Sequence, residues 1–383
     1  GLTVVSPTEF TVKLSAPQSD FPLRLGYTAF MPLPQAFFDD PKAFGENPIG
    51  NGPYMLAENG AWKHNVDISL VKNSAYSGGR KPMNGGVKIV FYATQEAAYA
   101  DLLADNLDVL SGIPDSALKT FQSDLGERAI SQAAAIFQSF TIPTRLAHFS
   151  GEEGNLRRQA ISMSINRQEV IDAIFNGTRQ PAKDFTSPVI AGWSDKLPGS
   201  EVLDFNATKA KELWAKADAI APWTGSFQIG YNADGGHQGW VDAVANQIKN
   251  TLGIDASGAP YPTFGEFRTA VTDQTIKTAF RTGWQADYPA LANFLEPLYQ
   301  TGAGANDGQF SNADVDALFQ EGNEAKTLDE ANAKFQKSQE LLFTYLPAIP
   351  MWYGKADGGY STKVSNVVWG WNSVPILNQI LKK

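Results

Sequence analysis

Two kinds of hydrophobic periodicity alternate along this chain, and their mixture constrains the fold more than any other feature. Apolar residues recur at every second position in residues 8–14 and 66–70, as in strands that bury one face. Helical spacing is found instead in residues 155–165, 207–219 and 240–252. The sequence therefore predicts an α/β protein in which strands and helices are mixed throughout.

Local signals set several element boundaries. Asn166 followed by Glu169 is a capping-box pattern, so we expect a helix to start there and to end at Gly177. Thr327 stands at the same kind of position before another helical segment. Gly253 is expected to stop the helix that precedes it.

Composition and alternation predict the structure of two further stretches. The proline-rich residues 31–53 are expected to form loops and turns, and residues 364–371 are expected to return to a sheet. Within the first stretch, IGNGPY (residues 49–54) is rich in glycine but lacks the GK[ST] ending of a phosphate-binding loop. We interpret it as a structural turn.

Composition excludes several classes of function. The chain has 383 residues, a net charge of −9 and no cluster of Lys and Arg, so no nucleic-acid partner is expected. It has no cysteine, which excludes disulfides, thiolate catalysis and cysteine-rich metal sites. Its three histidines are far apart in sequence, so neither a metal nor a cofactor is predicted. No apolar run is long enough to span a membrane.

The most suggestive segment for binding is RTGWQADYP, residues 281–289, which follows a strand pattern. Arg281, Trp284 and Asp287 bring a cation, a flat ring and a carboxylate together before a proline loop. A buried carboxylate is costly unless it is paired, and a ligand ammonium group would be a fitting partner. An internal Arg281–Asp287 ion pair is the alternative, and the sequence does not decide between them.

His237 is a second candidate, because it lies in a polar, glycine-rich turn just before the 240–252 helix. A helix N-terminus favours anions, so this histidine could meet a ligand carboxylate. An exposed loop histidine is the simpler interpretation.

Enzyme motifs are absent. There is no GxSxG segment, and no histidine and serine arrangement suggests a catalytic triad. Glu152 with Glu153 is expected to be a solvated loop pair, and Asp287 with Glu296 lacks a glycosidase motif around it. The prediction is that the chain is not an enzyme, with an acid-dependent glycosidase as the rival from another class.

Five segments together resemble one known family. They are NPIGNGPYML (47–56), a block at 68–92, DLLADNLDVL (101–110), a block at 156–182 and GWQADYPALANFLEPLY (283–299). In this order and spacing they resemble the family 5 solute-binding proteins, which serve oligopeptide, dipeptide and nickel importers.

The resemblance implies a two-lobe α/β fold like that of periplasmic binding proteins (type II, cluster C), which closes on its ligand. Residues 1–138 would be the remainder of lobe I, residues 139–354 would be lobe II, and residues 355–383 would return to lobe I. The resemblance also implies that the chain starts where the N-terminal part of the family is ending. The extra N-terminal subdomain would then be largely missing.

The resemblance also implies a ligand site. Asp287 matches the position that binds a peptide α-ammonium, while Arg281 and His237 match positions directed at a peptide carboxylate. Phe264 lies near an aromatic position that packs on ligand side chains. Trp284 and Tyr288, which flank Asp287 in the same block, complete the predicted set.

The expected function is capture of short peptides for a membrane permease of an ABC importer, by a monomer outside the cytoplasm, either periplasmic or lipid-anchored. An oligosaccharide receptor of the same family, with Trp284 stacking on sugar, is the rival in this class. A peptide receptor for signalling without transport is a third alternative.

Overall fold

The computed structural model describes residues 1–383, which divide into two compact units. Unit 1 comprises Gly1–Tyr27 and Ala135–Gly354, and unit 2 comprises Thr28–Ala134 and Lys355–Lys383. Two of the passages between the units lie inside long strands, β8 (Ala129–Thr141) and β13 (Ala348–Tyr360). All six predicted site residues lie in unit 1. The assignment of these stretches to the lobes of a binding protein stays a prediction.

One mixed sheet is the centre of unit 1. Its strands run in the order β11 (Ala256–Tyr261), β10 (Phe227–Asn232), β12 (Ala279–Gln285), β8 and β13, and the short β9 (Gln180–Pro181) also pairs with β13. The pairs β10–β11 and β10–β12 are parallel, whereas β12 and β8 are antiparallel. In the β12–β8 register Arg281 lies opposite Phe140 and Trp284 opposite Phe137. The mixed α/β class predicted from the sequence is confirmed.

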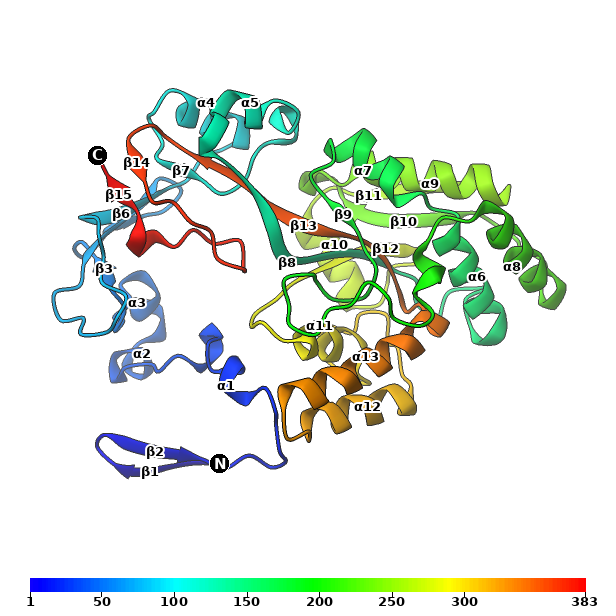
Figure 1. The fold of residues 1–383 in the computed structure, drawn as a ribbon, viewed down its shortest axis with the longest axis horizontal. Coiled ribbons are helices and arrows are strands. Elements are labelled where there is room, and N and C mark those ends of the chain that lie inside the picture. The colour runs from blue at the N-terminus through cyan, green and yellow to red at the C-terminus, as the bar shows by residue number, and fades with distance from the viewer. The chain divides into compact units, whose positions relative to one another are not determined.

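Helices cover this sheet, and several of them start and end at predicted signals. The helices of unit 1 are α1 (Phe21–Arg24), α6 (Gly151–Met163), α7 (Arg167–Phe175), α8 (Ala207–Ile220), α9 (Gln238–Leu252), α10 (Phe264–Thr272), α11 (Leu291–Tyr299), α12 (Ala313–Asn323) and α13 (Leu328–Tyr345). Helices α12 and α13 pack together as a pair (Figure 1).

The N-cap predictions for α7 and α13 and the C-cap prediction for α9 are confirmed, whereas α7 ends at Phe175 with Asn176, and not Gly177, as its left-handed C-cap. Asn166 accepts a hydrogen bond from the backbone N–H of Glu169 at 3.3 Å, and Thr327 accepts one from Glu330 at 3.2 Å. Gly253, with a φ of +72°, forms the left-handed C-cap of α9.

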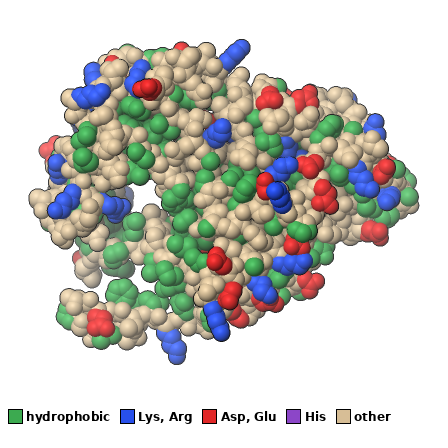
Figure 2. All heavy atoms as spheres, viewed as in Figure 1, with side chains coloured by type: hydrophobic (Ala, Val, Ile, Leu, Met, Phe, Trp, Pro, Cys, Tyr) green, Lys and Arg blue, Asp and Glu red, His purple; other side chains and the backbone are tan.

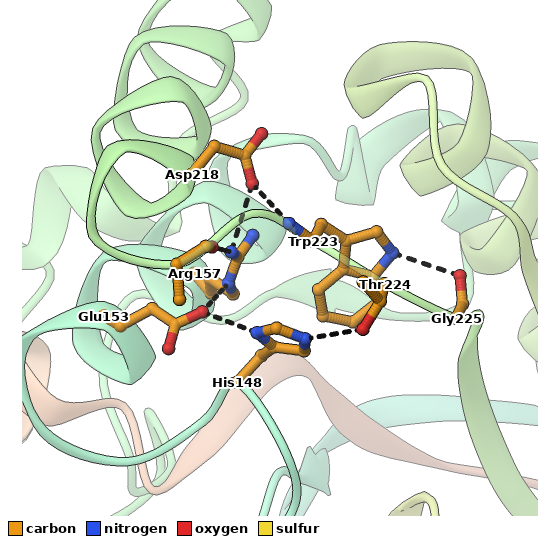
Figure 3. A network of polar contacts seen from close by, with 8 residues as sticks. His148, Glu153, Arg157, Asp218, Trp223, Thr224 and Gly225 are labelled. Carbon is orange, nitrogen blue, oxygen red and sulfur yellow. Dashed lines mark hydrogen bonds and ion pairs between the residues drawn. The ribbon is translucent and has the colours of Figure 1, made fainter.

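A buried polar network fixes α6 against α8 (Figure 3). The fully buried guanidinium of Arg157 contacts Glu153 at 2.8 Å and Asp218 at 3.1 Å, and it also lies over the ring of Trp223. His148 contacts the same Glu153 carboxylate at 2.7 Å. Since a buried charge is stable only when it is paired, these partners let the arginine remain inside the core.

This network corrects one expectation. Glu152 and Glu153, expected to be a solvated loop pair, lie in the first turn of α6. There Glu153 is mostly buried, because His148 and Arg157 both bind its carboxylate. Those two partners lower the pKa of Glu153 despite the opposing effect of burial.

Unit 2 is built around a smaller sheet and a helical cluster. Strands β3 (Tyr54–Leu56), β5 (Asp67–Lys72) and β4 (Trp62–Lys63) form the sheet, and β6 (Gly86–Val90) pairs with β5. Helices α4 (Gln95–Leu103) and α5 (Phe121–Leu125) contribute Leu102 and Phe121, both fully buried, to a hydrophobic core. Strand β7 (Val109–Leu110) pairs with the end of β13.

Two expectations for unit 2 were wrong in part. Residues 31–53 contain α2 (Gln35–Asp39) and α3 (Pro41–Glu46) as well as turns. The side chain of Asp40 caps α3, and Pro41 occupies the first helical position, where proline is tolerated. Of residues 364–371, only β14 (Val364–Ser365) is a strand, and it pairs with β15 (Leu381–Lys382).

The N-terminal hairpin of unit 1 also differs from its expectation. Residues 8–14 contain the strand β2 (Glu9–Val12), which pairs with β1 (Leu2–Ser6). The apolar side chains of this hairpin are exposed, including Val4 at 73% and Phe10 at 65%. The predicted strand is therefore present, but its apolar face is not buried in this structure.

The charged side chains are dispersed. On the face shown in Figure 2, Lys and Arg side chains are interspersed with Asp and Glu, without a continuous basic patch. No helix combines the length and hydropathy that a membrane span requires.

Candidate functional site

A pocket of 320 Å³ in unit 1 brings three of the predicted site residues together. Arg281 and Trp284 from β12 and Phe264 from the start of α10 all line it. The remaining wall is largely apolar and includes Phe267, Phe280 and Leu298. A concave, mostly apolar pocket with a few polar groups is the usual form of a small-ligand site, and this volume is at the lower end of that range.

Arg281 is held in this pocket by a relay of polar groups. Its Nε–H donates to Asn232 Oδ1 at 3.1 Å, and the amide of Asn232 donates to Asp234 at 2.6 Å. The guanidinium lies 5.6 Å from the ring centre of Phe264, a cation–π geometry. Burial lowers the pKa of Arg281, against the charge of Asp234, but the group remains a cation at neutral pH. Since only Nε makes a hydrogen bond, both terminal nitrogens can bind an anion.

Asp287 has no cationic partner within the chain, so the structure does not contain the alternative Arg281–Asp287 ion pair. Its carboxylate is partly buried and accepts one hydrogen bond, from the amide of Asn293 at 3.3 Å. The Oδ1 atom of Asn293 in turn accepts from the backbone N–H of Asp287 at 2.7 Å and from the indole Nε1–H of Trp284 at 3.3 Å. One oxygen of the Asp287 carboxylate is therefore left for a donor that the chain does not supply.

His237 immediately precedes α9, as predicted, but it does not line the pocket. Its Nδ1 accepts a hydrogen bond from Trp240 at 3.2 Å. Burial lowers the pKa of His237 to about 4, and the positive charge of Arg281 acts in the same direction against the charge of Asp234. At neutral pH this imidazole can donate from Nε2 but carries no charge.

A second arginine pairs with a carboxylate on the wall of the same pocket. Arg268 donates to both oxygens of Asp307, each at 2.7 Å, in a two-pronged arrangement. This pairing raises the pKa of Arg268. Arg281 is the other charged side chain in the lining of the pocket, and it has no carboxylate in direct contact.

Tyr288 lies outside the lining of this pocket. It is 8% exposed, and the guanidinium of Arg24 lies 5.4 Å from its ring centre. Burial raises the pKa of its phenol. Arg24 also binds Asp20 at 2.7 Å and Glu296 at 3.1 Å, so the Glu296 carboxylate is occupied by an internal ion pair.

The ion pair between Arg24 and Glu296 argues against the alternative that the chain is a glycosidase. A glycosidase needs two carboxyl groups facing one substrate bond, one of them as the proton donor. Glu296 instead faces Arg24 and Asn323. In addition, no three His, Asp or Glu side chains gather into a group that could hold a metal ion.

Sequence reasoning missed the asparagines that hold the site, Asn232 and Asn293, and the Arg268–Asp307 pair. One signal was available for Asn293, because it interrupts the strongly apolar run that forms α11. A polar side chain on the buried face of such a helix needs hydrogen-bond partners.

The family is decided by a match to a family model. Residues 1–306 match the model described as "Bacterial extracellular solute-binding proteins, family 5 Middle". The chain belongs to this family. Membership places the family 5 chain among solute-binding proteins and not among enzymes, and it confirms the resemblance noted in the sequence.

The curated relatives of this family 5 chain are named after several different ligands. The dipeptide-binding protein DppE of Bacillus subtilis is 25% identical over 355 residues, which are 89% of this chain and 62% of DppE. The periplasmic murein peptide-binding protein MppA of Escherichia coli is 24% identical, over 92% and 65% of the two chains. Heme-binding protein A of Haemophilus influenzae is 22% identical, over 86% and 58%. The chain thus spans less than two thirds of the length of these relatives.

Solved structures confirm the fold. DppA from Helicobacter pylori, in complex with the peptide STSA, matches with a TM-score of 0.83 and 19% identity over all of this chain and 74% of DppA. The E. coli murein tripeptide binding protein MppA matches with a TM-score of 0.82 and 20% identity, with the same coverage. At these identities the likeness concerns the fold, and the choice of ligand has to be argued from the site.

Proposed function

We propose that this family 5 solute-binding protein captures short peptides with a free amino terminus. The observation that carries the proposal is the carboxylate of Asp287, which is partly buried beside Trp284 without a cation. An α-ammonium group would supply the missing charge and a charge-assisted hydrogen bond. Arg281, with its terminal nitrogens free, would receive a carboxylate of the same ligand, and His237 would add a neutral N–H donor.

The pocket beside these groups would receive a ligand side chain. Its aromatic and aliphatic wall offers apolar contact, and Phe264 is 49% exposed and available for stacking. Waters could complete polar contacts, so that one site accepts several side chains. The family relationship supports delivery to an ABC permease from outside the cytoplasm, by a monomer, with or without a lipid anchor. Reception of a peptide for signalling would use the same groups.

Peptide capture explains the charged groups better than sugar capture does. A sugar would stack on Trp284 and Phe264 but would bring no cation to Asp287 and no anion to Arg281. The oligosaccharide alternative is therefore the second candidate, carried by the aromatic rings alone.

The test compares alanine peptides, from dipeptide to pentapeptide, with the same peptides acetylated at the amino terminus. We expect the free-amine form of the best-bound peptide to bind roughly 10- to 100-fold more tightly, the worth of a charge-assisted hydrogen bond. Asp287→Asn should abolish this preference. Isothermal titration calorimetry measures both affinities, and native mass spectrometry gives the peptide length.

The proposal fails if acetylated and free peptides bind equally well to the unaltered protein, or if no peptide binds. Binding of maltose or cellobiose oligomers in place of peptides, unaffected by Asp287→Asn, would favour the sugar receptor. The exposed pair Lys209–Glu212 on α8 supplies a control, since Lys209→Ala should leave the preference for a free amine intact.

A further inference from the structure

We infer that Asn293 is the positioning residue of the ligand site, because it holds the two groups that would meet a ligand amine and a ligand side chain. Asn293 is 2% exposed and lies in the first turn of α11, after the loop that follows β12. It contacts Trp284 and Asp287 through its side chain. This inference rests on the peptide-binding function proposed above.

The hydrogen bonds determine the orientation of the Asn293 amide. Its Oδ1 accepts from two N–H groups, the indole of Trp284 at 3.3 Å and the backbone of Asp287 at 2.7 Å. Its Nδ2 donates to the carboxylate of Asp287 at 3.3 Å. An amide rotated by half a turn would place its own N–H groups against two donors and its oxygen against a carboxylate. The surroundings therefore accept one orientation only.

This arrangement has a consequence for the free protein. Asn293 occupies Oδ2 of Asp287 and leaves Oδ1 for the ligand, while the same amide fixes the plane of the Trp284 ring. The ammonium-binding carboxylate and the aromatic wall of the pocket are thus set by one side chain before any ligand arrives. A preorganised site avoids the cost of ordering these groups on binding.

Other side chains at this position would lose part of the arrangement. Alanine would leave the indole N–H and the backbone N–H of Asp287 without their acceptor. Aspartate has nearly the same shape but would put a second carboxylate against Asp287. Two carboxylates at this distance share a proton, which raises the pKa of the pair.

A double-mutant cycle separates positioning from a general structural role. The probe is the alanine peptide that binds best, in its free-amine and N-acetylated forms. As a single substitution, Asn293→Ala should lower the affinity for the free-amine peptide by about tenfold and the affinity for the acetylated peptide by less than about threefold. In the Asp287→Asn background, Asn293→Ala should change the affinity of either form by less than about threefold, because the carboxylate it positions is gone.

The Asn293→Asp variant gives a second readout that does not depend on the alanine variant folding. Its affinity for the free-amine peptide should rise with pH from about 5 to 7, as the shared proton is released, and should rise more steeply than the affinity of the unaltered protein. Asn306 supplies a matched control, because it is a buried asparagine whose side chain binds only backbone groups, those of Gln300 and Phe310. Asn306→Ala should lower stability without changing the preference for a free amine.

The outcomes are distinguishable. If Asp287→Asn leaves the preference for a free amine intact, the proposed function fails. Suppose instead that Asp287→Asn removes that preference, but that Asn293→Ala lowers the affinity for the free-amine and acetylated peptides equally, with and without Asp287→Asn. Asn293 is then merely structural, and the positioning inference fails. A flat pH profile for Asn293→Asp would also overturn it.

Discussion

At the scale of single residues, two asparagines hold the charged groups of the site. Asn232 links Arg281 to Asp234, and Asn293 links Trp284 to Asp287. Neutral amides suit this task because each can donate and accept without adding a charge of its own. Arg281 and Asp287 are therefore each held by a neutral amide and do not pair with one another.

His237 gives the pH dependence expected of this site in the absence of ligand. Its pKa is about 4 in the folded protein and 6.5 in an unfolded chain. Between these values the unfolded chain binds a proton that the folded chain does not, so His237 makes the free energy of unfolding increase as pH rises through this window. Its stabilising contribution is present in full above 6.5 and is lost as the pH falls towards 4.

The measurement is urea unfolding of the unaltered protein and of His237→Asn at several pH values from about 4 to 7. The difference in unfolding free energy between the two proteins should grow with pH and become constant above 6.5. If the free energy of unfolding changes with pH equally in both proteins, His237 is as readily protonated in the folded chain as in the unfolded one.

Sequence reasoning named candidate site residues but not the contacts among them. Arg281, Trp284 and Asp287 could be found because they are close in sequence, at the end of one strand. Asn232 is 49 positions away from Arg281, and only the parallel pairing of β10 with β12 brings them together. Tyr288 is adjacent to Asp287 yet packs under Arg24, since neighbouring residues in a loop need not point into the same cavity.

At the scale of elements, helix ends were the most predictable feature, because caps depend on residues a few positions apart. Asn166, Thr327 and Gly253 all act as expected. Helices α2 and α3 were missed, since prolines suggested a loop and the capping role of Asp40 was overlooked. The long strands β8 and β13 are set by tertiary pairing and burial, which local periodicity does not record.

The cap of α13 makes a prediction with a matched control. Thr327→Ala should reduce the free energy of unfolding by about 1 kcal/mol, because the backbone N–H of Glu330 loses its acceptor. Ser150 precedes α6 and is also exposed, but its side chain makes no capping hydrogen bond. Ser150→Ala should therefore change stability by less than about 0.5 kcal/mol. Chemical unfolding measures the loss of stability in each variant. Equal losses for Thr327→Ala and Ser150→Ala would show that the Thr327 hydroxyl does not act as a cap.

At the scale of the whole molecule, the two units have separate hydrophobic cores. The core around Leu102 and Phe121 belongs to unit 2, whereas the candidate site belongs entirely to unit 1. Proteins with more than one compact unit commonly unfold in more than one step. Damage to the core of unit 2 should therefore spare the site.

Phe121→Ala tests this separation. Emptying the space of a fully buried phenylalanine should destabilise unit 2 by about 3–5 kcal/mol. In scanning calorimetry we expect one transition to move to lower temperature while the other stays. Phe38→Ala, at a position that is 64% exposed in the same unit, should move neither. A single transition that shifts as a whole would show that the two units unfold together.

The passages of the chain through β8 and β13 have a consequence for the order of folding. Unit 1 takes residues from both sides of Thr28–Ala134, and unit 2 takes residues from both sides of Ala135–Gly354. A chain that emerges from its amino end therefore cannot complete unit 1 until Gly354 has been made, or unit 2 until the segment after it has appeared. Each unit is completed only by sequence that follows a segment of the other unit, so neither is encoded by one uninterrupted piece of the gene.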